Sequence, residues 1–390
     1  MKAFFMITTL GHGKGGHFHD LKIISESLSK NVDIVVINIG LKKSPVINEI
    51  DLKVYNIYFN GINIFSIIRK LLNIFNIENP SFIQSFDIQS LCFARLLGFF
   101  KRIPVILTKC GGPNPNGYYP YSDNIIVMSL ENLKYFKESN QFNSSRIECF
   151  PNRCVPFNDD EIVSSEILKI AANRTSFLRI SRITDHYKSS LIQSINLVRD
   201  LNNDGLKVCL FIVGVVQSEE LFTLLKEHSK NVNEVYFMTE DKFTSNASKL
   251  IYACDIIIGT GRGVMEGAAK SKMILTPHKD SRYPVLIEKK NFYNLFSTNF
   301  SPRNNLIDFN ERNSYETIKT HVQYDKLKTE NIKFINEIYN KEFDISGVKD
   351  RYMNFYKNLL FSTKFKPFNF FRNFLSTIKT VYFAYKKSKV

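Results

Sequence analysis

The chain has 390 residues, of which 44% are apolar, a length that suits two domains of roughly 150 residues each and a tail. Its six cysteines form no Cys-x-x-Cys pair and no metal-ligand spacing, which argues against structural zinc and indicates the reduced thiols of a cytoplasmic protein. The net charge is +15, but nine of the Lys and Arg residues lie in residues 351–390, which contain no Asp or Glu, so we expect no nucleic-acid-binding face.

Short β-branched segments alternate with helical segments in the first part of the chain. Strands are predicted over "AFFMITTL", "VDIVVINIG", "SFIQSF" and "IPVILT", and helices over residues 15–30, 65–75 and 88–100. The alternation indicates a parallel sheet covered by helices. The N-terminal "KAFFMITTL" is better explained as the first strand than as a signal peptide, because no small-residue cleavage site follows it, and no stretch has the length and apolar character of a membrane span.

The alternation of strands and helices stops at a polar segment with two prolines, "IECFPNRCVPFNDD", and then begins again. A second set of strands is predicted over "TSFLRIS", "LKVCLFIVG", "NEVYFM", "CDIIIGT" and "KMILTP". We therefore predict an α/β protein with two Rossmann-like domains, residues 1–155 and 156–345, that face each other across a cleft. Residues 346–390 are predicted to form helices that return to the first domain, followed by a basic tail.

The first glycine-rich loop lies in "MITTLGHGKGGHFHD", directly after the first strand. Gly11, Gly13 and Gly16 fit the dinucleotide-binding pattern G-x-G-x-x-G, but the second strand ends without the acidic residue that would hold a ribose. The next acid is Glu49, beyond a turn, which argues against a dehydrogenase. The loop is either a simple tight turn or a place where backbone approaches a sugar phosphate, with Gly15 and Gly16 as the donor-binding candidates.

A second glycine-rich loop lies in "YACDIIIGTGRGVMEGAAKSKMILTP", between a buried strand and a helix predicted to start near Gly263. The free N–H groups of such a helix start form an anion site. Glu266, predicted in the first turn of this helix, is either an acceptor for sugar hydroxyls or only a favourable carboxylate near a helix start. The predicted donor-binding loop consists of Gly259, Thr260, Gly261, Arg262 and Gly263.

Two cations follow the first strand of the second half, in "FLRISRITDHYKSS". Arg182 and Lys188 are candidates to bind a diphosphate, although each is also compatible with an ordinary surface cation. Near the first glycine loop, His17 and His19 are candidates for the acceptor side of the site, or else solvated residues at a helix start.

At these residues the chain resembles the retaining glycosyltransferases of the GT-B fold, a family with many bacterial surface-polysaccharide enzymes. In that family an Arg closes the first strand of the second domain and a Lys follows, as Arg182 and Lys188 do here, and a late glycine loop leads into a helix that carries a Glu, here Glu266. The motif "NIIVMS" and the Pro-Asn turn before the linker also match, and the resemblance covers residues 1–340. The family usually has a second glutamate, eight positions earlier, where this chain has Ile258.

The resemblance implies transfer of a sugar, with retention, from a nucleoside-diphosphate sugar to a glycan or lipid-linked acceptor in cell-surface polysaccharide synthesis. Arg182, Lys188 and the loop N–H groups would stabilise the charge on the departing diphosphate, so no metal and no other cofactor is expected. A nucleotide-sugar epimerase and an inactive binding subunit of the same fold are the alternatives. The C-terminal tail argues against the epimerase, whereas the missing glutamate fits the inactive subunit.

The C-terminal tail combines its nine cations with twelve Phe or Tyr residues. From Pro367 a helix is predicted in which apolar residues recur at steps of three and four, and most polar residues fall on the other face. We expect this basic helix to hold the cytoplasmic protein peripherally on the anionic inner face of the cell membrane. The alternative is that its aromatic residues pack on the first domain. The apolar set is Phe371, Phe374, Leu375, Ile378, Tyr382 and Tyr385, and the polar set is Arg372, Asn373, Ser376, Lys379 and Lys386.

Overall fold

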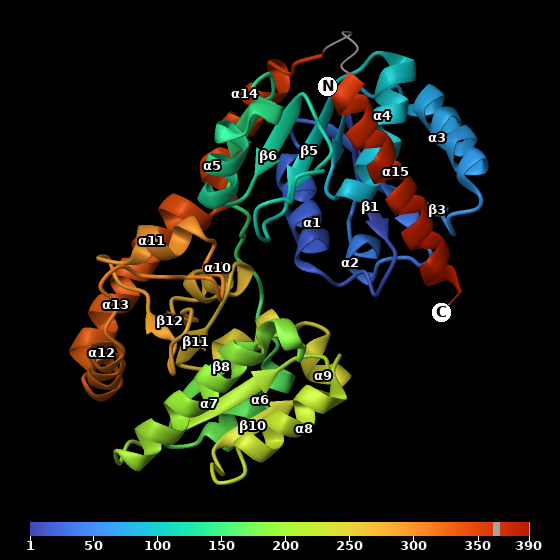
Figure 1. Cartoon of the computed structure of the whole chain (residues 1–390). Helices are drawn as coiled ribbons and strands as arrows, with labels where there is room; N and C mark the ends of the chain where they lie inside the picture. Colours follow the sequence, from blue (N-terminus) through green and yellow to red (C-terminus); the bar gives the residue numbers. More distant parts are fainter. Residues whose placement is uncertain (362–366, 390) are drawn as a thin grey trace. The chain divides into compact units, whose positions relative to one another are not determined.

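The computed structural model describes residues 1–361 and 367–389 and divides the chain into two compact units (Figure 1). The first unit contains Met1–Arg153 and the described residues from Ile345 onward, and the second contains Cys154–Asp344. Each unit holds a mainly parallel sheet covered by helices, so the predicted α/β class with two such domains is confirmed. The cleft stays a prediction. In the part of the chain that the structure describes, no helix is both long enough and apolar enough to cross a membrane.

The first unit has a parallel sheet with the strand order β3-β2-β1-β4-β5-β6-β7 in the described residues. The central strand β1 is buried at every residue after Lys2, as expected of a strand with helices on both faces. The strands are β1 (Lys2–Thr9), β2 (Asp33–Gly40), β3 (Lys53–Tyr58), β4 (Phe82–Ser85), β5 (Val105–Lys109), β6 (Asn124–Val127) and β7 (Arg146–Cys149).

Side-chain caps start several helices of the first unit. Asp87 accepts from the Ser90 N–H at 2.6 Å and starts α4, and Ser129 caps α5 in the same way. The helices are α1 (Gly16–Leu28), α2 (Pro45–Asn48), α3 (Ile64–Glu78), α4 (Ile88–Lys101), α5 (Leu130–Glu138), α14 (Lys349–Lys357) and α15 (Pro367–Ser388), with short 3-10 turns η1 (Asn140–Phe142) and η5 (Ile345–Val348).

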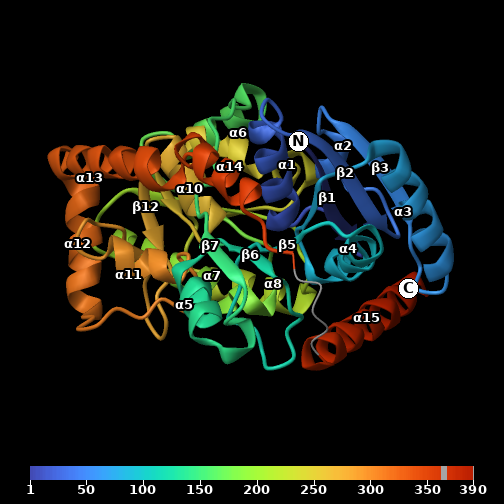
Figure 2. The ribbon, with the colours of Figure 1, turned by 90° about the horizontal axis from the view of Figure 1, so that it is seen from above.

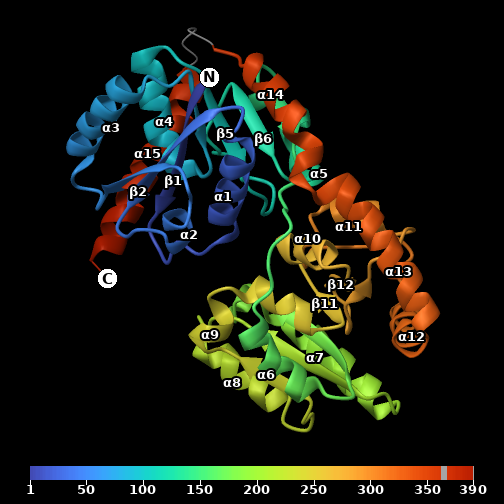
Figure 3. The ribbon, with the colours of Figure 1, turned by 180° about the vertical axis from the view of Figure 1, so that it is seen from behind.

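The C-terminal segment returns to the first unit, where α14 lies beside the sheet (Figure 3). The hydroxyl of Tyr356 in α14 donates to Gln84 Oε1 on β4 at 2.6 Å. Just beyond this helix, the backbone N–H and C=O of Leu360 both bond to the side chain of Asn124, each at 2.8 Å. The first unit is therefore completed by residues that are more than 200 positions distant in sequence from their partners.

The second unit has a sheet with the order β10-β9-β8-β11-β12-β13, in which β13 alone among these strands is antiparallel. Its strands are β8 (Thr175–Ile180), β9 (Val208–Val213), β10 (Val235–Met238), β11 (Ile256–Ile258), β12 (Met273–Thr276) and β13 (Val285–Leu286). Its helices are α6 (Glu161–Ala171), α7 (Lys188–Asn203), α8 (Glu219–His228), α9 (Asp241–Thr244), α10 (Arg262–Ala269), α11 (Phe292–Ser297), α12 (Glu311–Gln323) and α13 (Asp325–Ile338), with short turns η2 (Asp185–Tyr187), η3 (Ala247–Ala253) and η4 (Tyr339–Phe343).

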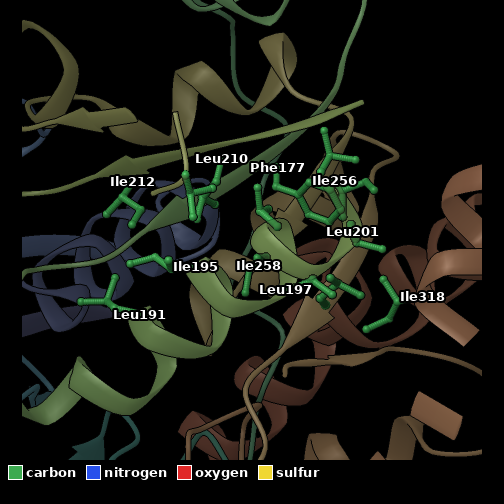
Figure 4. Packing of buried hydrophobic residues seen from close by; sticks show 14 of the residues in the cluster. Phe177, Leu191, Ile195, Leu197, Leu201, Leu210, Ile212, Ile256, Ile258 and Ile318 are labelled. Atoms are coloured by element: carbon green, nitrogen blue, oxygen red, sulfur yellow. The ribbon is translucent and has the colours of Figure 1, made fainter. Parts of the chain in front are cut away.

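The core of the second unit forms between α7 and the sheet (Figure 4). Leu191 and Ile195, four residues apart on α7, point toward the strands, as the helical repeat requires. They pack with Phe177 of β8, Ile212 of β9 and Ile258 of β11, all fully buried. This packing holds the ends of three neighbouring strands in fixed positions.

Each sheet has one glycine where the backbones of two strands come unusually close. A Cβ on Gly40, the last residue of β2, would lie 2.1 Å from the Thr9 carbonyl oxygen, and a Cβ on Gly214, just after β9, would lie 1.8 Å from the Ser181 carbonyl oxygen. Only glycine fits such contacts. In both units, therefore, a glycine lets the first two strands approach closely at their carboxyl ends.

Candidate functional site

The carboxyl edge of the second sheet brings the predicted loops together. The parallel strands β8, β9, β11 and β12 all end at this edge, and ligands of open α/β sheets bind outside such strand ends. Leu178 on β8 pairs with Ile257 on β11, so the loops that follow these two strands start at the same level. The loop with Arg182 and the glycine loop at 259–263 are therefore neighbours.

The glycine loop leads directly into α10, which begins at Arg262, close to the predicted start. Gly261 is the N-cap, with φ of 48°, a conformation that favours glycine, and it has no side chain to cap the helix. The N–H groups of Gly263 and Val264 bond instead to the carbonyl oxygens of Thr260 and Gly261, at 3.0 and 3.2 Å. A Cβ on Gly259 would lie 2.8 Å from the Val264 nitrogen, so this glycine lets the strand pass close to the helix. The N-terminus of α10 follows the carboxyl end of β11, so the positive end of the helix dipole lies at this edge and favours an anion.

Glu266 lies in α10, but not in its first turn as the sequence suggested. The helix starts one residue before Gly263, so its first turn contains no acidic residue and Glu266 falls in the second. The carboxylate is buried, and its Oε1 accepts from Arg262 Nε at 2.6 Å. The interpretation of Glu266 as a helix-start carboxylate is thus wrong, and Arg262 orients this side chain.

Arg182 and Lys188 are both exposed near the same edge. Arg182 lies two residues beyond β8, and Lys188 is the first residue of α7, after the short turn η2. Neither side chain has a hydrogen bond or an ion pair within residues 1–361 and 367–389. Both cations are therefore available to an incoming anion.

Arg179 is the functional candidate that sequence reasoning missed. Its side chain is fully buried within β8, and burial lowers the pKa of its guanidinium to about 10. Nη1 donates to the carbonyl oxygen of Ile258 at 3.0 Å, and Nη2 donates to Ser190 Oγ at 3.0 Å. The guanidinium thereby joins the end of β11, just before the glycine loop, to the first turn of α7, which carries Lys188. The signal in the sequence was a charged residue inside the otherwise uncharged strand segment "SFLRIS".

His278 follows β12 at the same edge, but its contacts indicate a structural role. Its Nε2 accepts from the Leu306 N–H at 3.0 Å, and its ring stacks on Phe309 with centroids 3.9 Å apart. Burial lowers the pKa of this imidazole, which favours the neutral form that can accept the bond. His278 therefore fixes the loop after β12.

The first glycine loop and its two histidines belong to the first unit. Gly15 is the N-cap of α1, and Gly16 is exposed with no atom within 4 Å of the position its Cβ would take. The ring of His17 folds back toward Gly15 and contacts Phe18, with ring centroids 4.3 Å apart. His17 and His19 are half-buried. The roles of these residues toward donor and acceptor stay predictions.

A buried ion pair fixes the start of α1. Arg153 Nε lies 3.2 Å from Asp20 Oδ1, with both side chains less than 5% exposed, and Arg153 Nη1 donates to the Pro151 carbonyl oxygen at 2.9 Å. The Pro-Asn turn is thereby tied to the helix that carries His17 and His19.

Neither a metal-ligand cluster nor a second hollow adds to this site in the described residues. Among the described residues, no group of three His, Cys, Asp or Glu is arranged to hold a metal ion. A hollow of about 450 Å³, lined in part by Arg174, Lys207 and Asp255, lies at the amino edge of the second sheet. Ligands of such sheets bind at the other edge, so this hollow is not the donor site.

No family model and no curated protein sequence matches the chain. Solved structures match over nearly all of it. HepE of Anabaena, solved with UDP-glucose, has a TM-score of 0.64 and 12% identity over 91% of this chain and 100% of that one. A glycosyltransferase of Rickettsia africae has a TM-score of 0.65 and 14% identity over 91% and 98%. A candidate UDP-N-acetylglucosamine 2-epimerase of Listeria monocytogenes has a TM-score of 0.58 and 11% identity over 91% and 95%.

These likenesses establish the fold. The chain has the GT-B architecture of two parallel-sheet α/β domains that is found among glycosyltransferases.

Proposed function

We propose that the protein is a glycosyltransferase that moves a sugar from a nucleoside-diphosphate sugar to an acceptor. The observation that carries this proposal is a pair of exposed cations, Arg182 and Lys188, near the N-terminus of α10. Neither cation has a hydrogen-bond or ion-pair partner among the described residues. A diphosphate offers the negative charge that all three groups bind. The solved complex of HepE with UDP-glucose makes UDP-sugars the first donors to test.

The chemistry assigns each group a role. As the sugar leaves, negative charge grows on the diphosphate, and cations and N–H groups already aimed at it stabilise the transition state more than the ground state. Glu266, held by Arg262, accepts hydroxyls of the donor ribose. We propose retention of the anomeric configuration and no divalent metal, since two cations and a helix N-terminus supply the positive charge.

The acceptor we propose is a glycan or a lipid-linked sugar in cell-surface polysaccharide synthesis, reached from the cytoplasm. His17 and His19 at the start of α1 are the acceptor-side candidates, and Gly15 and Gly16 allow close approach of backbone to the donor. An epimerase is the second candidate, because the Listeria monocytogenes structure shares the fold. An inactive binding subunit is the third, because Ile258 stands where the family has a glutamate.

Donor binding and product analysis separate these three functions. A panel of UDP-, GDP- and ADP-sugars is first screened by thermal shift, and the best donor is then incubated with and without membrane extract. Sugar transfer to extract components supports the proposal, whereas conversion to an epimeric nucleotide sugar identifies an epimerase. Binding without either reaction identifies a binding subunit. Arg182→Ala should lower the transfer rate by about 10²–10³, and the matched control Lys326→Ala, an exposed cation on α13, should leave it unchanged.

A further inference from the structure

Helix α15 lies beside α4 (Figures 1 and 2), and small side chains make the contact. Ser376, Thr380 and Ala384, spaced by four residues, are its buried residues. The Ser376 and Thr380 hydroxyl oxygens lie 3.9 and 3.6 Å from Cys92 Sγ on α4, and Ala384 belongs to the apolar core of the first unit. The spacing places all three on one face of the helix. That face is the one turned toward the protein.

Both halves of α15 are attached to the first unit. In the first half, Asn373 Oδ1 accepts from the Tyr121 N–H at 3.0 Å. In the second half, a Cβ on Gly61 would lie 2.6 Å from the Val381 carbonyl oxygen, so the loop before α3 lies directly on the helix. The helix is docked along its length.

The large apolar side chains of α15 lie away from this packed face. Phe371, Phe374, Ile378 and Tyr382 are 55%, 53%, 49% and 65% exposed, at steps of three and four residues. The sequence alternative in which the aromatic residues pack on the first unit is therefore wrong for Phe371, Phe374 and Tyr382. It holds in part for Tyr385, which is half-buried and lies against Gly61. The predicted polar face is also partly wrong, because its member Ser376 is buried against α4. Small residues pack there because α4 and the Gly61 loop approach the helix too closely for aromatic rings.

A row of cations borders the exposed apolar face. Arg372, Lys379 and Lys386 follow one another at seven-residue steps, which bring each back to nearly the same side of the helix. Ile62 and Phe65, 70% and 85% exposed, flank the Gly61 loop that contacts the second half of α15 and extend the apolar area. Large exposed apolar areas on a folded chain mark surfaces for a partner or a membrane.

We propose that the outward face of α15 is a membrane-binding surface that inserts its aromatic residues into the interface of an anionic bilayer while the helix stays docked on α4. Aromatic side chains enter the interface and neighbouring Lys and Arg side chains meet anionic headgroups. The positive charge favours a lipid surface over a second copy of the chain. Two copies paired through this face would bring their rows of cations together, and residues 351–390 contain no acidic residue to neutralise them. This inference does not rest on the proposed sugar transfer.

The test uses the full chain and co-sedimentation with vesicles of phosphatidylcholine alone or mixed with phosphatidylglycerol. The triple variant Phe371→Ser, Phe374→Ser, Tyr382→Ser should bind the mixed vesicles at least tenfold more weakly than the wild type. The matched control Ile162→Ser, Ile307→Ser replaces apolar residues of the second unit that are 83% and 84% exposed, and it should bind normally. Because all five positions are exposed, both variants should melt near the wild-type temperature.

The charge contribution is tested separately with Arg372→Gln, Lys379→Gln, Lys386→Gln. This variant should lose most of the preference for phosphatidylglycerol, and salt should weaken wild-type binding. Equal binding by the wild type and the Phe371, Phe374, Tyr382 variant, or no wild-type binding at low salt, overturns the proposal. So does a wild-type dimer in light scattering that the same variant converts to a monomer, because the face is then an interface between copies. Donor binding by thermal shift is measured alongside and should be unchanged in every variant.

Discussion

The buried guanidinium of Arg179 donates to the carbonyl oxygen of Ile258 at 3.0 Å, across two neighbouring strands of the second unit. In the described residues no carboxylate pairs with this charge; its partners are that carbonyl, Ser190 Oγ and the ring of Tyr187, 5.9 Å away. A buried cation without an acid is costly. Arg179 lies below the carboxyl edge of the second sheet, where an anionic donor would compensate its charge.

We expect Arg179→Lys to destabilise the second unit and to weaken donor binding. Lysine keeps the charge but cannot hold Ile258 and Ser190 at once, and each lost bond to a charged group costs roughly 1.5–3 kcal/mol. Denaturant unfolding measures the first effect and calorimetry with the best donor measures the second. If the variant is less stable but binds the donor with wild-type affinity, Arg179 is only structural.

We expect Arg182→Ala and Glu266→Ala to remain folded and to lose transfer activity. Arg182 is exposed, so its removal leaves no cavity, and the loss of one transition-state cation lowers kcat by about 10²–10³. Loss of Glu266 should raise the KM for the donor, because ribose hydroxyls lose their acceptor. Steady-state kinetics on the true donor checks both, and near-normal turnover in the two variants would contradict the site.

We expect transfer activity to persist in EDTA. In the proposed site, Arg182, Lys188 and the start of α10 would supply the positive charge that a metal supplies in other enzymes. The measurement is the transfer rate after dialysis against chelator, with and without added Mg²⁺ or Mn²⁺. Complete loss that either ion restores would show that the diphosphate needs a metal here.

We expect Gly214→Ala to damage the second unit and Gly263→Ala to be tolerated. The new Cβ at 214 would lie 1.8 Å from the Ser181 carbonyl oxygen, whereas at 263 nothing lies within 4 Å. Alanine at 263, inside α10, should even stabilise by about 0.5–1 kcal/mol through helix propensity. Thermal melting of both proteins is the check, and similar melting temperatures would mean that the strand ends can move apart.

We expect Glu78 to stabilise the first unit above about pH 4.5. Hydrogen bonds from Lys53 at 2.5 Å and Tyr55 at 2.7 Å, with Lys2 at 3.1 Å, lower the pKa of this carboxyl to about 2. The folded state then binds the proton less well than the unfolded state, so the stabilisation is complete above the ordinary pKa of 4.5 and is lost as the pH falls toward 2.

The Glu78→Gln variant should therefore melt below the wild type at pH 7, and the gap should close as the pH falls from 4.5 toward 2. The exposed Glu330→Gln is the control and should show no gap at any pH. A gap for Glu78→Gln that does not change with pH would mean that packing, and not charge, carries the effect.

The strands that sequence predicted well are those with continuous apolar segments, such as β1, β2, β8 and β9, because burial on both faces leaves a plain pattern. The outer strands β3 and β7 are only partly buried, and their mixture of charged and apolar residues hid them. The glycines before α10 predicted the start of this helix to within one residue. Helix boundaries and hydrophobic periodicity depend on residues that are close in sequence, so they can be predicted from the sequence.

Partners distant in sequence were not predictable in this way. Arg179 donates a hydrogen bond to the carbonyl oxygen of Ile258, 79 positions away, and no neighbouring residue in the sequence indicates that bond. On α15 the helical repeat separated the apolar residues from a polar set that includes Ser376, but it did not show that the face of Ser376 is the buried one. The inner face depends on how closely α4 and Gly61 approach the helix. Such distances are set by tertiary packing alone.

The first unit is interrupted in sequence by the whole of the second, and this has a consequence for the order in which the protein matures on the ribosome. Domains fold as units during synthesis, generally starting from the N-terminus. Here the strands made first cannot be fully covered until Tyr356 reaches Gln84, which happens only after the whole second unit has been synthesised. The second unit, although synthesised later than β1–β7, has all its residues first, so the nascent chain carries a complete second unit attached to an unfinished first one.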